Sequence, residues 1–218
     1  SSEGLQDIVK DGLTKVFVNA KVRVDHDLLA SAYSTYTGEP AITCIIGTGS
    51  NSCYFDGNEV SEVVPALAYI LGDEGSASYI GKRLVSDFLY KKLPQEMADD
   101  FFNTYQLDKD EIITSVYNKP NANVYLASFS RFAGKHMHTT YVQDIIREGF
   151  SKFADIHIAC FENCREVPVH FVGSVGAIFQ DILLEVLEER GMKLGQILRK
   201  PVDGLIKYHL EYLRVLDA

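Results

Sequence analysis

The chain has 218 residues, of which 46% are hydrophobic, and its formal net charge is −9 at pH 7. This length and composition allow one sizeable core, or one domain and part of another. Lysine and arginine cluster only in adjacent pairs, so we expect no nucleic-acid partner. No apolar run approaches the roughly 20 residues of a membrane span, so we expect no membrane insertion. The polar amino-terminal segment lacks a signal-peptide core, and we expect a cytoplasmic location.

The amino-terminal part predicts a helix, a strand and a second helix. Apolar residues at helical spacing predict a helix over residues 5–17, and alternating apolar and charged residues predict a half-buried strand over residues 20–24. Asp27 is expected to be the N-cap of the second helix, which runs from Leu28 onward.

A buried strand and a hairpin are predicted next. The β-branched apolar run AITCII, residues 41–46, predicts a strand covered on both faces, and it ends in the sequence GTGS. The following segment SCYFDGNEVSEVV predicts a β-hairpin. Its turn is expected at Asp56 and Gly57, or over a slightly longer stretch through Asn58.

The middle of the chain is predicted to be mainly helical. After a GDEGS loop, apolar residues at helical spacing predict an amphipathic helix that Pro94 ends. A mostly helical stretch then reaches about residue 161, and the KPNAN segment at residues 119–123 interrupts it. One long helix in this stretch is expected to line five apolar side chains on one face, namely Ile145, Ile146, Phe150, Phe153 and Ile156.

The carboxy-terminal part returns to alternating elements. The VPVHFVGS segment predicts a strand, and VGAIFQDILLEVLEERG predicts one helix that Gly191 ends. The tail predicts a short strand, a turn and a last helix. Strands that alternate with helices indicate an α/β layered fold.

The four cysteines match no zinc-ribbon or CxxC motif. Cys160 and Cys164 are four residues apart and could share a helix face. Free cysteines, however, usually behave as small buried hydrophobic residues. We therefore predict no metal site and a reducing compartment.

Three glycine-rich loops indicate a binding site. Glycine lets backbone N–H groups approach a ligand closely, and consecutive N–H groups cradle phosphate oxygens. Two of the loops follow predicted strands, and ligands of open α/β sheets bind beyond the carboxyl ends of strands. One such loop alone could be a simple tight turn. The loops are GTGS at residues 47–50, GDEGS at residues 72–76 and GSVG at residues 173–176.

Four segments, in their order along the chain, resemble the N-acetylglucosamine kinase group. They are IIGTGSNS, LGDEGSASYIGKRL, VYLASFSRFAG and VHFVGSVGAIFQDILLEVL. That group lies close to the BadF/BadG-type ATPases of the actin, hexokinase and Hsp70 superfamily. The resemblance implies two ribonuclease-H-like lobes with ATP in the cleft between them. We expect residues 1–40 to be a remainder of the amino-terminal lobe, and residues 41–218 to be the carboxy-terminal ATPase lobe with a helical insertion at about residues 90–160.

The same resemblance implies cofactors and partners. They are ATP with Mg²⁺ and a small sugar substrate, and a homodimer is left open. It further implies a phosphate loop formed by Gly47, Thr48, Gly49, Ser50 and Asn51. It also implies that an adenosine lies beside Gly173, Ser174 and Gly176.

Asp73 and Glu74 stand between two glycines at the mouth of a predicted helix. In the resembling kinases the aspartate of GDEGS binds sugar hydroxyls, so the resemblance implies that Asp73 is a substrate ligand. A carboxylate accepts the hydrogen bonds that paired hydroxyls donate. Glu74 is expected to point to the helix start, where its charge suits the dipole, or toward a metal-bound water. The alternative is that both acids merely cap the helix.

Phosphoryl transfer to a hydroxyl also needs a carboxylate that orients the hydroxyl and accepts its proton. Asp27, followed by LLASA, resembles the family pattern D-x-x-A-x-A at a strand-to-helix turn. Asp27 is therefore the predicted catalytic base and a second substrate ligand, with Asp25 as the alternative. His26 is interpreted as a bystander, and His136 and His138 are interpreted as part of a solvated turn.

The chain departs from the family pattern in two ways. The family begins with a D-G-G-T phosphate loop whose aspartate positions Mg²⁺, and these 218 residues contain no such motif. We expect most of the first lobe to be absent from this chain, and we expect poor ATP turnover without that loop. Some relatives carry Gly-Gly-Trp before GDEGS, but this chain has PALA at residues 65–68 and no tryptophan, which leaves the exact sugar open.

These patterns favour an ATP-dependent sugar kinase acting on N-acetylglucosamine or a similar amino sugar. A second hypothesis is a BadF-type activator ATPase that holds an iron–sulfur cluster, although Cys44 in an apolar strand and Cys53 in a hairpin do not resemble a cluster clamp. A third is a non-catalytic nucleotide-binding regulatory domain, because a fold does not determine function. Iron content would identify the second, and absence of sugar-dependent ADP release would identify the third.

Overall fold

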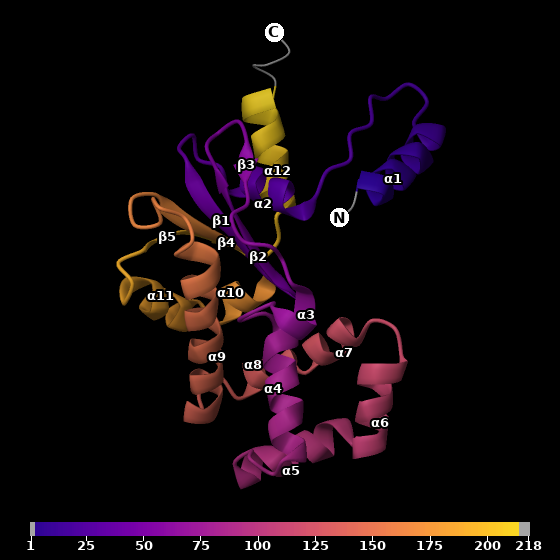
Figure 1. Cartoon of the computed structure of the whole chain (residues 1–218), viewed down its shortest axis with the longest axis vertical. Helices are drawn as coiled ribbons and strands as arrows, with labels where there is room; N and C mark the ends of the chain where they lie inside the picture. Colours follow the sequence, from indigo (N-terminus) through magenta and orange to yellow (C-terminus); the bar gives the residue numbers. More distant parts are fainter. Residues whose placement is uncertain (1–2, 214–218) are drawn as a thin grey trace.

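Five strands form one mixed sheet in the order β3-β2-β1-β4-β5 within residues 3–213, the part of the chain that this computed structural model describes (Figure 1). β1, β4 and β5 are parallel, whereas β2 runs antiparallel to both of its neighbours. The predicted α/β class is therefore confirmed. The strands are β1 (Ala41–Ile46), β2 (Ser50–Phe55), β3 (Val60–Ser61), β4 (Pro168–Val172) and β5 (Lys193–Leu198).

The central position of β1 follows from its apolar sequence. Nearly all of its side chains are buried, as predicted for a strand that is covered on both faces. β1 and β4 are parallel neighbours, with Ile45 opposite Val172, so their carboxyl ends meet at the same edge of the sheet. Gly47 directly follows β1 and Gly173 directly follows β4. The topology therefore brings the two glycine loops together.

The predicted hairpin between β2 and β3 is confirmed, and it has the longer turn. The Asp56 carboxylate accepts hydrogen bonds from the backbone N–H groups of Asn58 at 2.7 Å and Glu59 at 2.8 Å. Aspartate at the start of a turn commonly makes such bonds to the residues that follow. The side chain of Asp56 thus stabilises the reversal that pairs β3 with β2.

Helices cover both faces of the sheet. On one face α2 (Asp27–Thr35) packs on β1 and β2, and α12 (Val202–Tyr208) packs on α2. On the other face the main core lies under α4 (Ala77–Leu89), α9 (Thr140–Phe153) and α11 (Gln180–Glu188). These helices bury one apolar side each, as the 3.6-residue spacing of their leucine, isoleucine and phenylalanine residues predicts.

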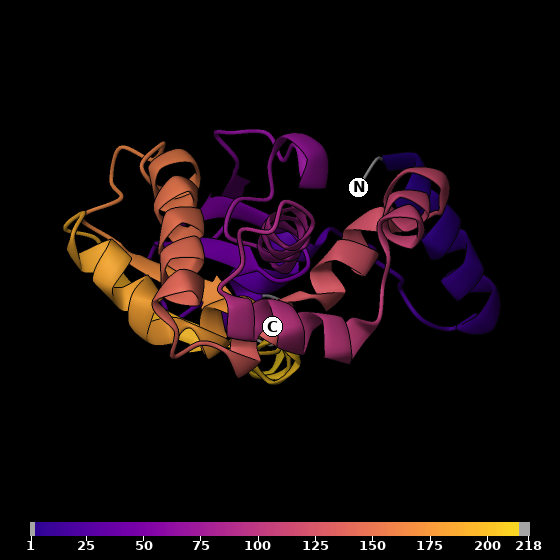
Figure 2. The ribbon, with the colours of Figure 1, turned by 90° about the horizontal axis from the view of Figure 1, so that it is seen from below.

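The segment between α4 and α9 is helical, as the sequence predicted, and its status as an insertion stays a prediction. Figure 2 shows α6 and α7 on the side of α4 opposite α9 and α11. Phe101, Phe129 and Phe132 belong to the same buried cluster as the sheet residues, so this segment extends the main core. Its elements are α5 (Gln95–Tyr105), α6 (Lys109–Ile113), η1 (Thr114–Asn118), α7 (Ala122–Ser128) and α8 (Ser130–Lys135), and η2 (Ala154–Ile158) continues α9.

The predicted amino-terminal helix is present as α1 (Glu3–Val16), and it stands apart from the sheet (Figure 1). Its apolar face is uncovered, with Ile8 67% and Val16 72% exposed. The boundary at residue 40 between two lobes stays a prediction. The remaining elements are α3 (Ala68–Leu71), α10 (Ser174–Ile178) and η3 (His209–Leu213).

Two predictions near the start of α2 are wrong. Residues 20–24 form no strand, because no strand within residues 3–213 lies beside them to pair with their backbone. The N-cap of α2 is His26 and not Asp27, since His26 Nδ1 accepts the Leu29 backbone N–H at 3.3 Å. Asp27 is the first residue of the helix.

Two further predictions fail along the helices. The helix expected after Gly173 is broken into α10 and α11 at Phe179, where φ is −108° and ψ is 32°. Ile156 does not continue the apolar face of α9, because the helix widens into the π-helical turn η2 and leaves Ile156 42% exposed. The change of pitch rotates the side chains that follow Phe153 out of register.

Candidate functional site

Two glycine loops meet at the carboxyl edge of β1 and β4. Gly173 has a φ of +132°, a conformation that side chains larger than hydrogen rarely adopt. A Cβ at this position would collide with the Ile46 carbonyl oxygen and lie 3.1 Å from the Gly47 nitrogen. Glycine at position 173 therefore permits a close backbone approach between the loop after β4 and the loop after β1.

The GTGS turn is held from behind by the start of α4. The backbone N–H groups of Ala77 and Ser78 donate to the carbonyls of Gly47 and Thr48 at 2.8 Å and 3.1 Å. The C=O and N–H of a trans peptide point in opposite directions. The N–H groups of Thr48 and Gly49 therefore point away from α4, and neither has a partner among residues 3–213. Two adjacent, free N–H groups in a turn form a cradle for an anion.

Asp73 packs directly against this turn. Its Oδ1 accepts the Ser50 backbone N–H at 3.1 Å. A Cβ at Gly49 would lie 2.8 Å from the same oxygen, so position 49 must be glycine for the carboxylate to sit there. Asp73 has a φ of +58°. Its Oδ2 has no hydrogen-bond partner in the described part of the chain and can accept one from a ligand.

The surroundings raise the pKa of Asp73. Burial is the largest cause and is opposed by the hydrogen bond from the Ser50 backbone N–H. The neighbouring charge of Glu74 raises the pKa further, whereas His157 and Lys82 lower it. The carboxylate thus lies in a partly dehydrated site, where a hydroxyl donor would offset the cost of its charge.

Glu74 does not point to the helix start, contrary to the first of the two alternatives from the sequence. The N-cap of α4 is Ser76, whose Oγ accepts the Tyr79 backbone N–H at 3.2 Å. Glu74 Oε2 instead lies 3.2 Å from Nε2 of His157, which is buried in η2. This contact joins residues 83 positions apart.

The two candidate bases differ in their partners. Asp25 forms an ion pair with Arg23 at 2.9 Å and accepts the His26 backbone N–H at 3.2 Å. Asp27 accepts only the adjacent Leu28 backbone N–H, at 3.1 Å, within the described residues. The structure records no contact between Asp27 and Asp73. The Asp27 carboxylate has fewer partners and is freer to accept a hydrogen bond from a ligand than that of Asp25.

Comparison with known proteins identifies the family. A solved structure of a proposed N-acetylglucosamine kinase from Porphyromonas gingivalis is 33% identical to this chain, and the match covers 97% of this chain and 75% of that one with a TM-score of 0.93. This chain belongs to the N-acetylglucosamine kinase family. A second proposed N-acetylglucosamine kinase, from Chromobacterium violaceum, is 16% identical over 92% of this chain and 71% of that one, with a TM-score of 0.69, and is similar in fold. No family model and no curated protein matches the sequence.

Membership of the N-acetylglucosamine kinase family confirms the ribonuclease-H-like fold that the resemblance of the sequence implied. The sheet with its covering helices has the actin-like ATPase fold. The assignment of residues 41–218 to the second lobe and of the segment before them to the first lobe stays a prediction. No helix within residues 3–213 is long and apolar enough to cross a bilayer.

The other residues predicted to bind ATP lie at the same edge of the sheet, and their surroundings differ from one another. Asn51 is on β2, where its side-chain amide donates to Glu62 at 3.5 Å. Ser174 is the exposed first residue of α10. Gly176 is buried, and a Cβ there would face the core side chains of Leu183 and Phe171. The predicted place of Gly176 beside the adenosine stays a prediction.

The remaining histidines and cysteines form no metal site within residues 3–213. His136 contacts Asp100 at 2.7 Å, with its ring 6.3 Å from that of His138. Burial raises the pKa of Cys53 to about 12 and that of Cys44 well above its usual value. Buried thiols of this kind stay protonated, and thiolate is the form that binds metals.

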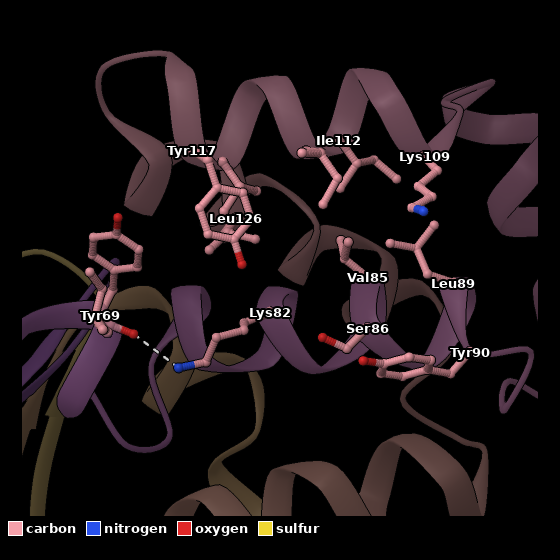
Figure 3. A pocket seen from close by; sticks show the side chains of 13 residues that line it. Tyr69, Lys82, Val85, Ser86, Leu89, Tyr90, Lys109, Ile112, Tyr117 and Leu126 are labelled. Carbon is pink, nitrogen blue, oxygen red and sulfur yellow. Dashed lines mark hydrogen bonds between the residues drawn. The ribbon is translucent and has the colours of Figure 1, made fainter.

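A pocket of about 700 Å³ lies apart from the glycine loops, between α3, α4, α6, η1 and α7 (Figure 3). Its walls are mostly apolar and include Val85, Leu89 and Leu126. Lys82 enters it from α4 and donates to the Tyr69 carbonyl at 2.9 Å. None of the residues predicted from the sequence as ligands of ATP or sugar lines this pocket.

Proposed function

We propose that the protein is an ATP-dependent kinase that phosphorylates a hydroxyl of an amino sugar such as N-acetylglucosamine. The observation that supports this most is the unit formed by the GTGS turn and Asp73. One side of that turn offers two free N–H donors, suited to phosphate oxygens, and a carboxylate suited to hydroxyls packs against it. Donors for the phosphate and an acceptor for the sugar thus belong to one hydrogen-bonded structure.

In the proposed complex, phosphate oxygens of ATP accept hydrogen bonds from the N–H groups of Thr48 and Gly49. α4 supports this arrangement because its first N–H groups already bind the carbonyls of the same turn. The donors are thus fixed before the nucleotide arrives, which lowers the cost of ordering them on binding. The loop at Gly173 and Ser174 lies beside the turn, as required for a segment that contacts the rest of the nucleotide.

Asp73 would hold the sugar, and Asp27 would act on the attacking hydroxyl. Asp73 Oδ1 is fixed by Ser50, which leaves Oδ2 to accept a sugar hydroxyl. Asp27 would orient the reacting hydroxyl and accept its proton late in a loose transition state. Asp25 is a weaker candidate, because Arg23 already occupies its carboxylate.

Magnesium, when bound, would neutralise charge on the phosphates of ATP during transfer. Residues 3–213 bring together no group of three or more histidine, cysteine, aspartate or glutamate side chains that could hold it.

The test is a kinetic comparison of three variants of the intact protein with N-acetylglucosamine and Mg-ATP. Asp73→Asn should raise the Michaelis constant for the sugar far more than that for ATP, because each charge-assisted hydrogen bond contributes about 1.5–3 kcal/mol. Asp27→Asn should lower turnover by roughly 10²–10⁴-fold while both ligands still bind, since it removes the proton acceptor. Asp25→Asn is the matched control and should be much milder.

The outcomes separate the assignments. Equal increases in both Michaelis constants for Asp73→Asn would remove Asp73 as a sugar ligand. An inactive Asp25→Asn beside an active Asp27→Asn would move the base by two residues. If the full-length gene product releases no ADP in response to any amino sugar, the kinase proposal itself fails.

A further inference from the structure

His157 makes one specific polar contact from a buried position. Its side chain is 4% exposed, and its Nε2 lies 3.2 Å from Oε2 of Glu74. The other ring nitrogen, Nδ1, is buried and has no partner among residues 3–213. A neutral imidazole carries its proton on one nitrogen only. Because Glu74 offers the acceptor at Nε2, the Nε2–H tautomer satisfies this arrangement and the other does not.

The backbone and ring of His157 are themselves held in place. Its carbonyl accepts a hydrogen bond from Ser52 Oγ at 2.6 Å, which ties η2 to β2. Its ring stacks on Phe153, with the centroids 5.0 Å apart and the planes inclined by 20°. His157 is therefore a rigid donor whose position is set by the sheet.

Hydrogen bonds join β2, the GDEGS loop and His157 into one connected network. Ser50 donates from its backbone N–H to Asp73 Oδ1 and from its Oγ to the Glu74 carbonyl at 2.8 Å. Glu74 then contacts His157, and Ser52 connects His157 back to β2. The loop is thus held from two sides by residues that belong to, or are bound to, one strand.

Such restraint matters because the loop has an unfavourable backbone. Asp73 has a φ of +58°, a region that non-glycine residues seldom adopt, and Gly75 follows with a φ of +69°. Left without its anchors, the loop would relax and move the Asp73 carboxylate off the GTGS turn. Surrounding contacts must therefore maintain a conformation of this kind.

We propose that His157 is a positioning residue for the sugar site, which donates from Nε2 to Glu74 and thereby fixes the loop that presents Asp73. The inference rests on the proposed role of Asp73 as a ligand of the sugar. Sequence patterns give no sign of it, since His157 is a single histidine in a helical stretch far from GDEGS.

The test compares two substitutions of similar size in the full chain. His157→Phe keeps a flat ring that can stack on Phe153 but removes the donor, whereas His157→Gln keeps an N–H donor near the position of Nε2. We expect His157→Phe to weaken N-acetylglucosamine binding about tenfold or more by calorimetry, and His157→Gln to restore most of that loss. Exchange of the Ser50 amide proton should also quicken about tenfold in His157→Phe, because its partner Asp73 is released.

Two further measurements test the role of His157 if His157→Phe folds poorly. Nitrogen NMR of the imidazole should show the Nε2–H tautomer in the unaltered protein and a changed tautomer balance in Glu74→Ala. Glu74→Ala should weaken sugar binding as His157→Phe does, and the double variant should be no worse than either. Sugar binding that His157→Phe leaves unchanged, or additive losses in the double variant, would overturn the inference. Absence of sugar binding in the unaltered protein would refute the proposed function instead, while Ser50 exchange still reports on the loop.

Discussion

The lack of a side chain at Gly49 leaves room for the carboxylate of Asp73, the candidate sugar ligand. A Cβ at this position would lie 2.8 Å from Asp73 Oδ1 and 2.9 Å from Oδ2, closer than van der Waals contact allows. We predict that Gly49→Ala pushes the carboxylate away and breaks its bond to the Ser50 backbone N–H. The loss should appear as faster exchange of the Ser50 amide proton, by about tenfold if that bond contributes ~1.4 kcal/mol.

The control for this prediction is Gly47→Ala in the same turn. A Cβ at Gly47 would meet no atom within 4 Å, so the Ser50–Asp73 bond should survive. Similar Ser50 exchange rates in the two variants would show that the close contact at position 49 does not hold Asp73 in place.

Residues of the candidate site differ in how far the sequence reveals them. Asp73 and the glycines belong to short motifs in which glycine, serine and acidic residues occur together, so their chemistry can be predicted from local patterns. Glu74 could be noticed but its direction could not be predicted, because that depends on His157, 83 positions away. Long-range contacts between single polar residues leave no periodic signal in a sequence.

At the scale of elements, the packing of α4 on α7 depends on Gly81. This glycine is buried in the middle of α4, and a Cβ there would collide with the Leu126 carbonyl oxygen of α7. Gly81→Ala should therefore destabilise the protein by about 1–3 kcal/mol through overpacking, despite the better helix propensity of alanine. Chemical denaturation would measure this as a lower midpoint.

Gly134 provides the matched control in a neighbouring helix. It lies in α8, and a Cβ there would meet no atom within 4 Å. Gly134→Ala should raise stability by roughly 0.5–1 kcal/mol, because alanine loses less backbone entropy in a helix. Equal effects at the two positions would refute the role of Gly81 as the point of close approach.

The elements that the sequence predicted well are those whose own pattern decides their structure. β1 is an unbroken apolar run, and α4 has regular apolar spacing, so burial follows from local sequence alone. Residues 20–24 alternate like a strand, yet a strand exists only when a neighbour supplies hydrogen bonds. The break between α10 and α11 at Phe179 is likewise set by packing: Phe179 is 3% exposed in the core, where its burial outweighs a continuous helix.

For the molecule as a whole, the sheet buries a histidine that should couple stability to pH. His170 is 3% exposed in β4, its Nδ1 accepts the Gln196 backbone N–H at 2.8 Å, and its Nε2 has no partner within residues 3–213. Burial lowers the pKa of His170 to about 4 from its usual value near 6.5. The native protein therefore keeps this imidazole neutral at a pH where the unfolded chain already binds a proton.

The sign of the effect follows from which state binds more protons. Above about pH 6.5 both states are neutral at His170 and contribute no pH dependence. Between about pH 6.5 and 4 only the unfolded chain is protonated at this residue, so stability falls as the pH is lowered, by up to roughly 3 kcal/mol over that range. Below the folded pKa both states are protonated and the contribution levels off. Stability curves from chemical denaturation across pH 4–7 measure the slope.

His170→Asn isolates this contribution, because the asparagine side-chain oxygen can replace Nδ1 as the acceptor for Gln196 and does not titrate. The substitution leaves a small cavity, so the variant should be less stable than the unaltered protein at pH 7, and the cost of the cavity itself does not depend on pH. The difference in stability between the two proteins should therefore shrink as the pH falls from about 6.5 to 4, since only the unaltered protein loses stability through this residue. A difference that stays constant over the range would show that His170 titrates alike in the folded and unfolded chains, and that the buried face of β4 admits its charge.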